Sequence, residues 1–361
     1  MTAMTADINS GLEGVVVAAT AISDVQGKKG DLSYRGKSID HWVQQDFSTV
    51  AAAVIDWPNL AIDEEMAGLL YKWGELTQRE SETVLGHIDL HPMAVVQGLV
   101  PLLSIPPTKG SARQAEALTG LAIAARLPHI VATMIARKPV EYPQEQDYAG
   151  RFLKMLGHEN PTDLERRALS VTQILQLEHS LNAGTFAARV TASTQASLPA
   201  AISSALGALS GVLHGGADQA AMEMADQVGG ADAAEAFVQA KLKASEKIMG
   251  MGHREYKVVD PRAVHVKRLA EDLVRGTPHE VAYRTLEAVE AAFARAMAAR
   301  GKPLHANLEF YKGCVYRALG IPDDAFTAVF AMARVFGYIA HVLESRTNAR
   351  IVRPAALYLG S

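Results

Sequence analysis

The stretch that decides the fold spans residues 324–344 and reads DAFTAVFAMARVFGYIAHVLE. Its apolar side chains recur three and four positions apart, which predicts a long helix with one apolar face. That face carries Phe326, Val329, Phe330, Ala333, Gly337 and Ala340. Arg334 lies one turn after Phe330, beside this face. A buried guanidinium requires a carboxylate or an anionic ligand, so the stretch predicts a core helix that carries a charged group in need of a partner.

Two further stretches show the same helical spacing of apolar residues. One begins at Pro161-Thr162 and continues to residues 178–182, so that polar groups enter beside a buried stripe. The other runs from Tyr283 to Arg300, and Gly301 is a natural C-terminal stop. The apolar positions are Leu164, Ala168, Val171 and Leu175 in the first stretch and Leu286, Val289, Phe293 and Met297 in the second.

The N-terminal part of the chain predicts a small β hairpin. Val15 to Ser23 is rich in β-forming residues, the sequence GKKGD turns the chain, and Leu32 to Tyr34 can pair back. No internal repeat or linker-like tract is evident elsewhere. We therefore predict an all-α fold class with a small N-terminal β hairpin.

The bulk composition indicates a globular protein that binds small molecules. The 361 residues are 49% apolar, which is enough for a sizeable core. The formal net charge of -4 gives no basic field, so we expect no nucleic-acid partner. Residues 196–213 are nearly long enough to span a membrane, but Ser, Gly and Pro199 interrupt them, and we expect a packed helix and no membrane partner. The single Cys314 and the lack of a signal-peptide pattern lead us to expect a cytoplasmic protein.

Two histidines follow or lie among glycines, where the backbone can approach a ligand closely. His214 lies in GALSGVLHGGADQ, residues 207–219, at the end of a small-residue helix. His253 lies in KIMGMGHREYKVVDPRA, residues 247–263, with Lys257 and Arg262 close behind it. These cations could bind phosphates or carboxylates. A histidine satisfied by a helix-terminal carbonyl and a solvated basic loop remain open as alternatives.

A carboxylate and two arginines complete the set of candidate residues. Glu309 lies between Leu308 and Phe310 in HANLEFYKGCVYRALGIP, residues 305–322, and an apolar setting would suit a base that removes a proton from carbon. Arg334 and, in RIVRPAALYLG at residues 350–360, Arg353 place cations in apolar surroundings. An exposed or ion-paired Glu309 and structural ion pairs for both arginines remain open.

Taken together, these segments closely resemble the signature segments of the citrate synthase family. They run in the family order from about Tyr142 to Gly360 and read EHSLNAGTFAARVTAST, GALSGVLHGGA, IMGMGHREYKVVDPRA, ANLEFYKGCVYRALGIPDDAFTAVFAMARVFGYIAHVLE and RIVRP. The resemblance implies a citrate synthase-like, two-domain helical fold. Residues 1–215 and 326–361 would form a large dimerisation domain, and residues 216–325 a small domain that closes over the substrates. It also implies a homodimer, with higher homo-oligomers left open.

The resemblance implies a role for each candidate residue. His214 matches the histidine that hydrogen-bonds the acetyl-CoA thioester oxygen, Glu309 the carboxylate that removes the methyl proton, and His253 the histidine that activates the oxaloacetate carbonyl. Residues that bind the carboxylates of oxaloacetate and product are matched by His179, Asn307, Arg262, Arg334 and, from the neighbouring subunit, Arg353. Residues that contact CoA are matched by Lys257, Met249, Gly250, Met251 and Gly252. The implied chemistry needs no metal or other cofactor, because the CoA thioester is a substrate.

The chain departs from the family pattern near the site. Glu309 stands where Asp is usual, and the extra methylene moves the carboxylate by about an ångström. Gly184 stands where Ser is common, and Glu255 where a small apolar residue is common. His305-Ala306 replaces Tyr-Pro, and residues 216–219 read GADQ instead of Gly-Ala-Asn-Glu.

Three functions follow from this resemblance. The leading one is condensation of acetyl-CoA with oxaloacetate to citrate and CoA. A second keeps the mechanism and changes a substrate, as in 2-methylcitrate synthase or a synthase for another 2-oxo acid; one extra methylene changes binding by only about 1 to 3 kcal/mol. A third is a catalytically weak paralogue that binds CoA or a dicarboxylate. Retention of both histidines opposite a carboxylate favours an enzyme, since binding alone would not need them.

Overall fold

The structure is a computed structural model that describes residues 9, 11–212, 214–348 and 350–358. Within these residues it has sixteen α-helices and one three-stranded sheet, so the predicted all-α class with a small N-terminal β element is confirmed. The strands are β1 Ser23–Gln26, β2 Asp31–Tyr34 and β3 Lys37–Ser38. The helices are α1 Ile39–Trp42, α2 Phe47–Ile55, α3 Met66–Lys72, α4 Gln78–Leu85, α5 Pro92–Leu99, α6 Ala112–Ala136, α7 Tyr148–Met155, α8 Asp163–Gln176, α9 Ala183–Ser193, α10 Leu198–Leu209, α11 Ala217–Val228, α12 Ala234–Lys243, α13 Pro261–Val274, α14 Glu280–Ala299, α15 Leu308–Ala318 and α16 Phe326–Ser345.

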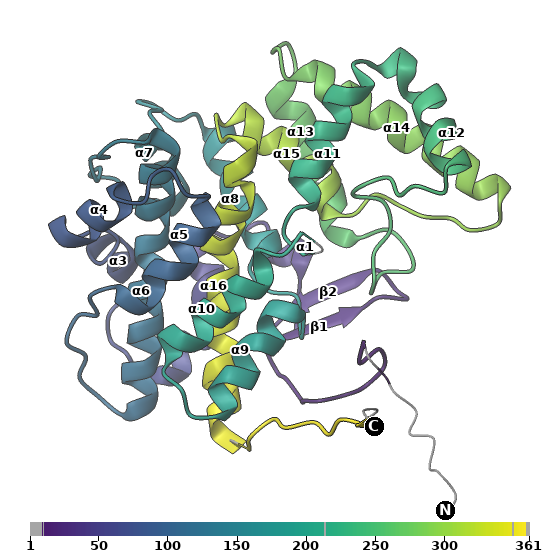
Figure 1. Cartoon of the computed structure of the whole chain (residues 1–361). Helices are drawn as coiled ribbons and strands as arrows, with labels where there is room; N and C mark the ends of the chain where they lie inside the picture. Colours follow the sequence, from purple (N-terminus) through teal and green to yellow (C-terminus); the bar gives the residue numbers. More distant parts are fainter. Residues whose placement is uncertain (1–8, 10, 213, 349, 359–361) are drawn as a thin grey trace, which may run out of the picture.

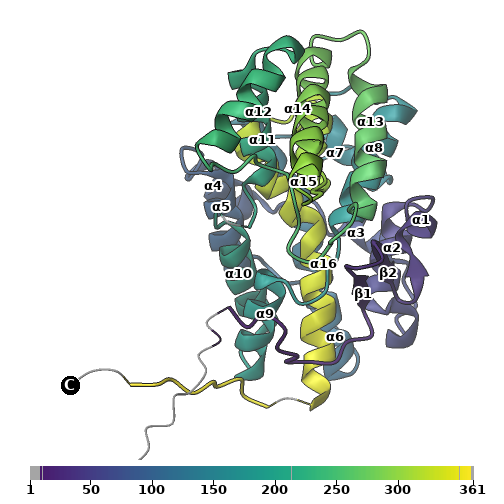
Figure 2. The ribbon, with the colours of Figure 1, turned by 90° about the vertical axis from the view of Figure 1, so that its right-hand side faces the viewer.

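Helix α16 runs through the middle of the molecule, with helices on several sides (Figure 1, Figure 2). It contacts α2, α6, α8, α9 and α10. The predicted helix and the burial of its apolar face are confirmed, and burial extends to every residue from Phe326 to Leu343. A helix surrounded by other helices has no solvent face to carry polar residues. Arg334 is therefore buried in the centre of the fold.

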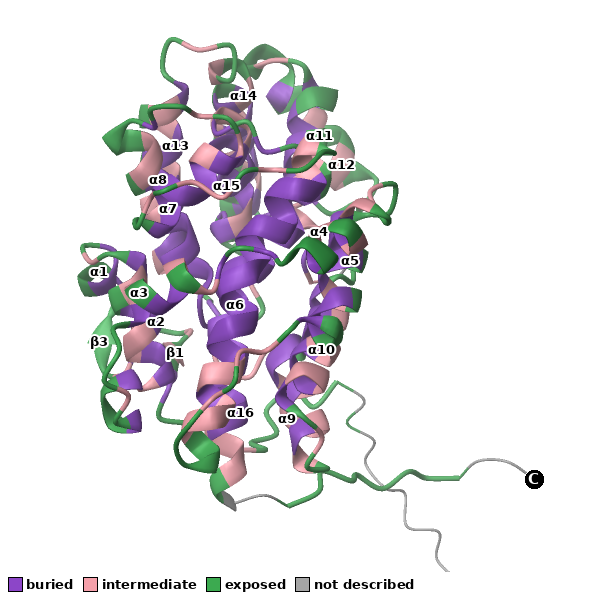
Figure 3. Ribbon diagram, turned by 90° about the vertical axis from the view of Figure 1, so that its left-hand side faces the viewer, coloured by how far each residue is buried: buried purple, intermediate pink, exposed green. Residues whose placement is uncertain are grey.

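In the described part of the chain, two helices are long and apolar enough to cross a membrane, namely α6 and α16. Burial inside the protein covers 89% of the apolar window of α6 and 100% of that of α16, as expected of core helices (Figure 3). The segment predicted as a packed helix, residues 196–213, forms α10 from Leu198 to Leu209. Its last residue, Leu213, lies outside the described residues.

The helix predicted from Tyr283 to Arg300 is confirmed as α14, and the one predicted from Pro161-Thr162 as α8, but α8 ends at Gln176 and residues 178–182 lie in the loop before α9. Helix α8 begins after Thr162, whose hydroxyl accepts from the Glu165 N–H while the Glu165 carboxylate accepts from the Thr162 N–H, a reciprocal cap that fixes the first turn. Helix α14 ends at Ala299, and Gly301 follows in the left-handed region with φ +66°. One detail was wrong, because Leu164 is 36% exposed instead of buried.

The β hairpin differs from its prediction at the first strand. The partner strand, Leu32 to Tyr34, is confirmed within β2, but the first strand is Ser23–Gln26 and not Val15 to Ser23. The short turn pairs Gln26 with Asp31, so only the residues directly before the turn can reach β2. Val16 is 89% exposed, and no strand partner covers it among the described residues. A third strand, β3, pairs with β2.

Helices α11 to α15 lie together at one end of the molecule (Figure 1, Figure 2). They pack on one another, and α13 and α15 also contact α8. This group covers most of residues 216–325, the predicted small domain, whose closure over substrates stays a prediction. Its contact with α8 brings the start of α15 close to the loop that follows α8.

Candidate active site

Most of the candidate residues lie in four loops or helix ends that meet where the α11–α15 group contacts the rest of the fold. His179 lies in the loop from α8 to α9, and His214 in the loop from α10 to α11. His253 lies between α12 and α13, Glu309 in the first turn of α15, and Arg334 in α16. The charge of Glu309 acts on both His214 and His253, which places the three candidate catalytic side chains in one electrostatic environment.

His253 is fixed in one tautomer by the backbone around it. Its Nδ1 accepts from the N–H groups of Glu255 at 3.0 Å and Tyr256 at 3.2 Å, so the ring proton is on Nε2. Burial lowers the pKa of His253 to about 4, and the charge of Arg262 acts in the same direction, while Asp260 and Glu309 oppose it. His253 is therefore a neutral donor near pH 7.

Arg262 presents a second donor at the same point. Its Nη2 lies 3.2 Å from Nε2 of His253. Because Nε2 carries a proton, neither atom can accept from the other, and the two donors converge on a position that an oxygen acceptor would satisfy. Asp260 holds the guanidinium by two bonds, Nε–Oδ1 at 2.9 Å and Nη2–Oδ2 at 2.8 Å. Arg262 is therefore not part of a solvated basic loop, and its buried pair with Asp260 orients the donor.

His179 and Tyr256 form an aromatic group with His253. The Nε2 of His179 lies 3.2 Å from the Tyr256 hydroxyl, and the ring centroids of His179 and His253 are 5.3 Å apart. Burial, with the charges of Arg262 and His253, holds the pKa of His179 well below its ordinary value. Both histidines are therefore uncharged near pH 7 and can take part in hydrogen bonds beside the guanidinium of Arg262.

Arg334 is the buried cation with an unmet electrostatic demand. Its Nε donates to the Gln176 carbonyl at 2.6 Å, and its guanidinium carbon lies 4.8 Å from the centre of the Phe330 ring. No carboxylate forms an ion pair with it in the part of the chain that the structure describes. Its charge contributes to the lowered pKa values of His179 and His214. An anionic ligand near these histidines would supply the missing partner.

His214 is positioned by Asn182, four residues after Glu178. Its Nε2 lies 3.4 Å from Asn182 Oδ1, which also accepts from the Thr185 N–H at 3.1 Å. Burial lowers the pKa of His214 and Arg334 adds to this, so the ring is neutral near pH 7. A 3.4 Å contact is weak. The neutral ring can therefore give up Asn182 and donate to a substrate oxygen instead.

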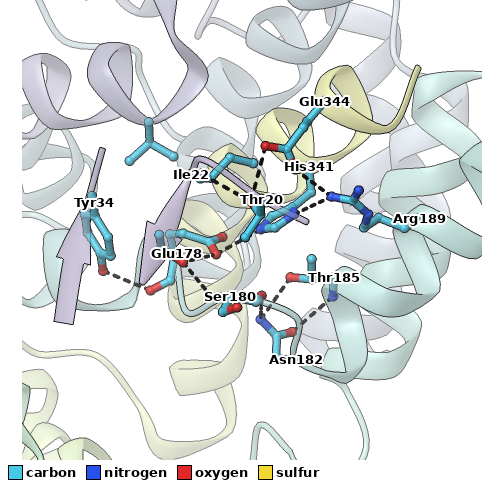
Figure 4. Close-up of polar contacts among 12 residues, drawn as sticks. Thr20, Ile22, Tyr34, Glu178, Ser180, Asn182, Thr185, Arg189, His341 and Glu344 are labelled. Carbon is cyan, nitrogen blue, oxygen red and sulfur yellow. Dashed lines mark hydrogen bonds and ion pairs between the residues drawn. The ribbon is translucent and has the colours of Figure 1, made fainter. Parts of the chain in front are cut away.

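The loop that carries His179 and Asn182 rests on a buried polar network around Glu178 (Figure 4). The Glu178 carboxylate accepts from Ser23 Oγ and pairs with His341 Nε2, both at 3.0 Å. The Tyr34 hydroxyl donates to the Glu178 carbonyl at 2.9 Å. Burial alone would raise the pKa of Glu178, but His341, followed by Arg334, outweighs it and the pKa is lowered. A buried network with these partners fixes the loop between β1, β2 and α16.

Glu309 lies in the first turn of α15, on the same helix face as Lys312. Its Oε2 lies 2.5 Å from Lys312 Nζ, which also lies 3.1 Å from Asp218 Oδ2 and donates to Gln176 Oε1 at 2.9 Å. The Glu309 side chain is 17% exposed, whereas those of Lys312 and Asp218 are fully buried. The open alternative of an ion-paired Glu309 is therefore observed, and the pair leaves one carboxylate oxygen, Oε1, without a partner from Lys312.

Asn307 connects α15 to the candidate CoA loop. Its Oδ1 accepts from the Glu309 N–H and its Nδ2 donates to the Gly252 carbonyl, both at 2.9 Å. Met251 pairs with Ala306 in an antiparallel bridge. Gly250 has φ +76°, and a Cβ there would lie 2.7 Å from the Phe310 ring, so a side chain has no room at this position. Asn307 therefore holds the loop and the Glu309 backbone together.

The remaining predicted residues lie around this core. Met249 and Gly252 flank the same loop, and the exposed Lys257 donates from Nζ to the Arg254 carbonyl at 2.8 Å. Gly252, His253 and Lys257 line a cavity of about 180 Å³ that residues 303–306 close on the other side. Arg353 lies apart, in an exposed extended tail over residues 350–358 (Figure 1). Among the described residues, no cluster of three or more His, Cys, Asp or Glu is arranged to hold a metal ion.

Several residues that organise the site were missed from the sequence. Asp260 had a readable signal, because Asp followed by Pro is typical of a helix start and Arg262 lies two residues later. Lys312 lies three residues after Glu309, which is the spacing of an ion pair on a helix. Tyr256 had no such local signal, since its partner comes from another segment. Asp218 stood out only as a departure from the family pattern, and its contact with Lys312 depends on helix packing.

Comparison with known proteins agrees with this geometry. The family described as "Citrate synthase, C-terminal domain" matches residues 11–355. Citrate synthase 2 of Bacillus subtilis is 34% identical over 97% of this chain and 95% of its own length. A 2-methylcitrate synthase of Mycobacterium tuberculosis is also 34% identical, over 98% of this chain and 91% of its own.

Solved structures give the same answer. Citrate synthase of Pyrobaculum aerophilum is 31% identical with a TM-score of 0.87, covering 98% of this chain and 93% of its own. The citrate synthase of Thermoplasma acidophilum, in a complex with carboxymethyl coenzyme A and oxaloacetate, is 27% identical with a TM-score of 0.89. The match covers 98% of this chain and 97% of that chain. Fold and site together define an acyl-transferring, carbon-carbon bond-forming enzyme. The chain belongs to the citrate synthase family.

Proposed function

We propose that this enzyme condenses acetyl-CoA with oxaloacetate and releases citrate and free CoA. The observation that carries the proposal is the convergence of two donors, Nε2 of His253 and Nη2 of Arg262, 3.2 Å apart. Arg334, which forms no ion pair among the described residues, acts with Arg262 and His253 on the neighbouring His179. A 2-oxo dicarboxylic acid offers what these groups lack, a carbonyl oxygen for the donors and carboxylates for the arginines.

The first chemical step assigned to the site is formation of an enol from the thioester. The Glu309 carboxylate takes a proton from the methyl carbon, and the electron pair of the C–H bond forms the C=C bond while the carbonyl oxygen gains charge. His214 donates its N–H to that oxygen. A weak carbon acid requires this simultaneous stabilisation, because a carboxylate alone is far too weak a base.

The second step joins the two substrates. The enol carbon attacks the 2-oxo carbon, whose oxygen gains the electron pair of the C=O bond and is stabilised by the donors of His253 and Arg262. Water then cleaves the thioester, so that acetyl-CoA, oxaloacetate and water become citrate and CoA. Neutral histidines serve both steps, in agreement with the lowered pKa values of His214 and His253.

The assembly proposed for this enzyme is a homodimer in the cytoplasm. The tail over residues 350–358 leaves Ile351 64%, Leu357 50% and Tyr358 82% exposed in a single chain. Apolar side chains presented in this way are typical of a surface that a second subunit covers. Arg353 in the same tail would then reach the neighbouring subunit's site. Sedimentation of the purified chain tests the dimer.

The experiment that tests the function is release of free CoA thiol, with acetyl-CoA and propionyl-CoA each paired with oxaloacetate. We expect strong release with acetyl-CoA and weaker release with propionyl-CoA. A preference for propionyl-CoA would instead assign the chain to methylcitrate formation, which the Mycobacterium tuberculosis relative makes the specific alternative. No release with either donor would overturn the proposal.

A further inference from the structure

Lys312 is unusual among the lysines because it is fully buried in the candidate site, in contact with two carboxylates and one amide oxygen. Its ammonium has three N–H groups. One of them donates to Gln176 Oε1 at 2.9 Å, and the charged ammonium forms ion pairs with Glu309 Oε2 at 2.5 Å and Asp218 Oδ2 at 3.1 Å. Phe330 adds a cation–π contact, with its ring centre 4.5 Å from Nζ. The mechanism described above uses none of Lys312, Asp218 or Gln176.

The three partners of Lys312 come from three different elements. Glu309 and Lys312 lie on α15, Asp218 on α11 and Gln176 at the end of α8. Gln176 is held in turn, because its Nε2 donates to the Tyr316 hydroxyl at 2.7 Å. Contacts to three elements restrict the Lys312 side chain to one conformation. Its ammonium can therefore orient a neighbouring carboxylate.

The charges of the cluster do not cancel. Lys312 carries +1, while Asp218 and Glu309 each carry -1 when ionised. The lysine and Asp218 side chains are fully buried, and Glu309 is 17% exposed. The two fully buried charges therefore balance each other, and the remaining negative charge belongs to the group at the edge of the site.

We propose that Lys312 and Asp218 are positioning residues that make Glu309 an effective base: Lys312 holds one carboxylate oxygen in place, and Asp218 offsets the lysine's charge so that the other oxygen stays basic. The proposal rests on the role of Glu309 in the proposed function. The proposal explains how a glutamate can serve where the family usually has an aspartate. The ion pair with Lys312 fixes the position of the Glu309 carboxylate, so the longer side chain does not leave it misplaced.

The proposal gives the two positioning residues opposite effects on Glu309. Without Asp218, Lys312 has only Glu309 as counter-charge, the negative form of Glu309 is favoured, and the pKa of Glu309 falls. Without Lys312, that form loses its cation and the pKa of Glu309 rises. Burial, together with the charge of Glu309, already raises the pKa of Asp218 to about 6 against the opposing charge of Lys312, which agrees with two carboxylates sharing one cation.

The other titratable groups near Glu309 do not change charge near pH 7, so they do not interfere with the comparison of the variants. His214, in the loop before α11, and His253, in the loop before α13, are both neutral near pH 7 because their pKa values are lowered. Tyr316 on α15 has a pKa raised well above its ordinary value. Arg334 on α16 is a further cation, and its charge acts on His214. The test therefore reads the two charges of the cluster itself, Lys312 in contact with Glu309 and Asp218 in contact with Lys312.

The experiment compares Asp218→Asn, Lys312→Met and the double variant, with Lys241→Met as control. The control removes a lysine on α12, outside the site, that pairs with Glu246 after the helix. The pKa of the Glu309 carboxyl is measured by carbon-13 NMR on glutamate-labelled full-length protein, with the Glu309 signal assigned by its loss in Glu309→Gln. We expect the pKa of Glu309 to be lower in Asp218→Asn than in the wild type and higher in Lys312→Met. In the control it should equal the wild-type value.

Turnover gives the second readout. We expect Lys312→Met to lower kcat on the order of a hundredfold, with the KM for oxaloacetate unchanged within about twofold, because the base is displaced and the acid site is intact. The acid limb of the pH–kcat profile should shift in the same order as the pKa values. If Lys312→Met fails to fold, the double variant replaces it, since it leaves no buried charge unpaired, and its Glu309 pKa should exceed that of Asp218→Asn.

Failure of this inference differs from failure of the proposed function. Equal Glu309 pKa values in all variants, or the reverse order, would overturn the role of Lys312 and Asp218 even if the wild type is fully active. An inactive wild type with the expected order of pKa values would overturn the assigned substrates and leave the cluster as described.

Discussion

At the scale of the residue, the departures from the family pattern are compensated by specific neighbours. Gly184, where the family commonly has Ser, lies against Tyr338: a Cβ at residue 184 would be 2.3 Å from the tyrosine hydroxyl and 3.1 Å from the Ala205 carbonyl. The buried Tyr338 hydroxyl has no hydrogen-bond partner among the described residues. The Tyr338 side chain on α16 thus fills the space that a serine would need on α9.

Replacing Gly184 by Ser should therefore destabilise the protein. We expect the free energy of unfolding to fall by about 1–3 kcal/mol, because the new Cβ overpacks the site. Tyr338→Phe alone should be nearly neutral, since it removes an unpartnered hydroxyl. The double variant should recover part of the loss in urea denaturation, and strictly additive effects would contradict the contact.

The sequence was informative about single residues where chemistry is local. Glycines beside His214 and His253 and the apolar neighbours of Glu309 indicated the site. The partners of these residues were harder to predict, since Tyr256 reaches His179 across 77 positions and Lys312 reaches Gln176 across 136. Such pairs depend on helix packing, which periodicity in one sequence does not encode.

At the scale of the element, helix α16 positions the site as well as filling the core. Gly337 faces the loop after α8: a Cβ there would be 2.4 Å from Glu178 Oε2 and 2.6 Å from the Leu177 carbonyl. His341, one turn further, pairs with the same carboxylate. The sequence predicted the helix and placed Gly337 on a buried face, but its close approach to Glu178 depends on the neighbouring loop.

Gly337→Ala should displace the Glu178–His179 loop. We expect a loss of about 1–3 kcal/mol of unfolding free energy and a raised KM for oxaloacetate. The matched control is Gly68→Ala in α3, where no atom lies within 4 Å of the added Cβ. This substitution should stabilise by about 0.5–1 kcal/mol, because alanine favours the helix. Equal effects of the two substitutions on KM would contradict the proposed role of Gly337.

At the scale of the whole molecule, four histidines are kept neutral by burial. The pKa values of His129, His179, His214 and His253 are all lowered, that of His253 to about 4. An unfolded histidine has a pKa of about 6.5, so the unfolded chain binds protons first as the pH falls. The stability that these histidines confer is therefore fully present above about pH 6.5. It is lost as the pH falls from about 6.5 towards the lowered pKa of each histidine in the folded protein.

We therefore expect the free energy of unfolding to fall steadily from pH 6.5 to pH 5. For His253 alone the loss at pH 5 is about 2 kcal/mol. Asp218 acts in the opposite direction, since its pKa is raised to about 6 and its folded form takes up a proton first, but it is one group against four. Urea denaturation across this range checks the slope, and a flat or rising curve would contradict it.

The fold class could be predicted from the whole sequence because helical periodicity and family-like segments agree along most of the chain. The hairpin could not be placed correctly, since Val15 to Val17 have the composition of a strand but the turn length assigns pairing to Ser23–Gln26. In our proposal the tail at residues 350–358 contacts a second subunit. The sequence of one chain does not define such a contact.

The central claim is that Glu309 removes the proton that starts the condensation. Glu309→Gln keeps the size of the side chain and removes the base, so CoA release from acetyl-CoA and oxaloacetate should fall by a factor of about 10² to 10⁴. Glu246→Gln, at an exposed carboxylate after α12, is the control and should match wild type. Turnover of Glu309→Gln equal to wild type would contradict the account.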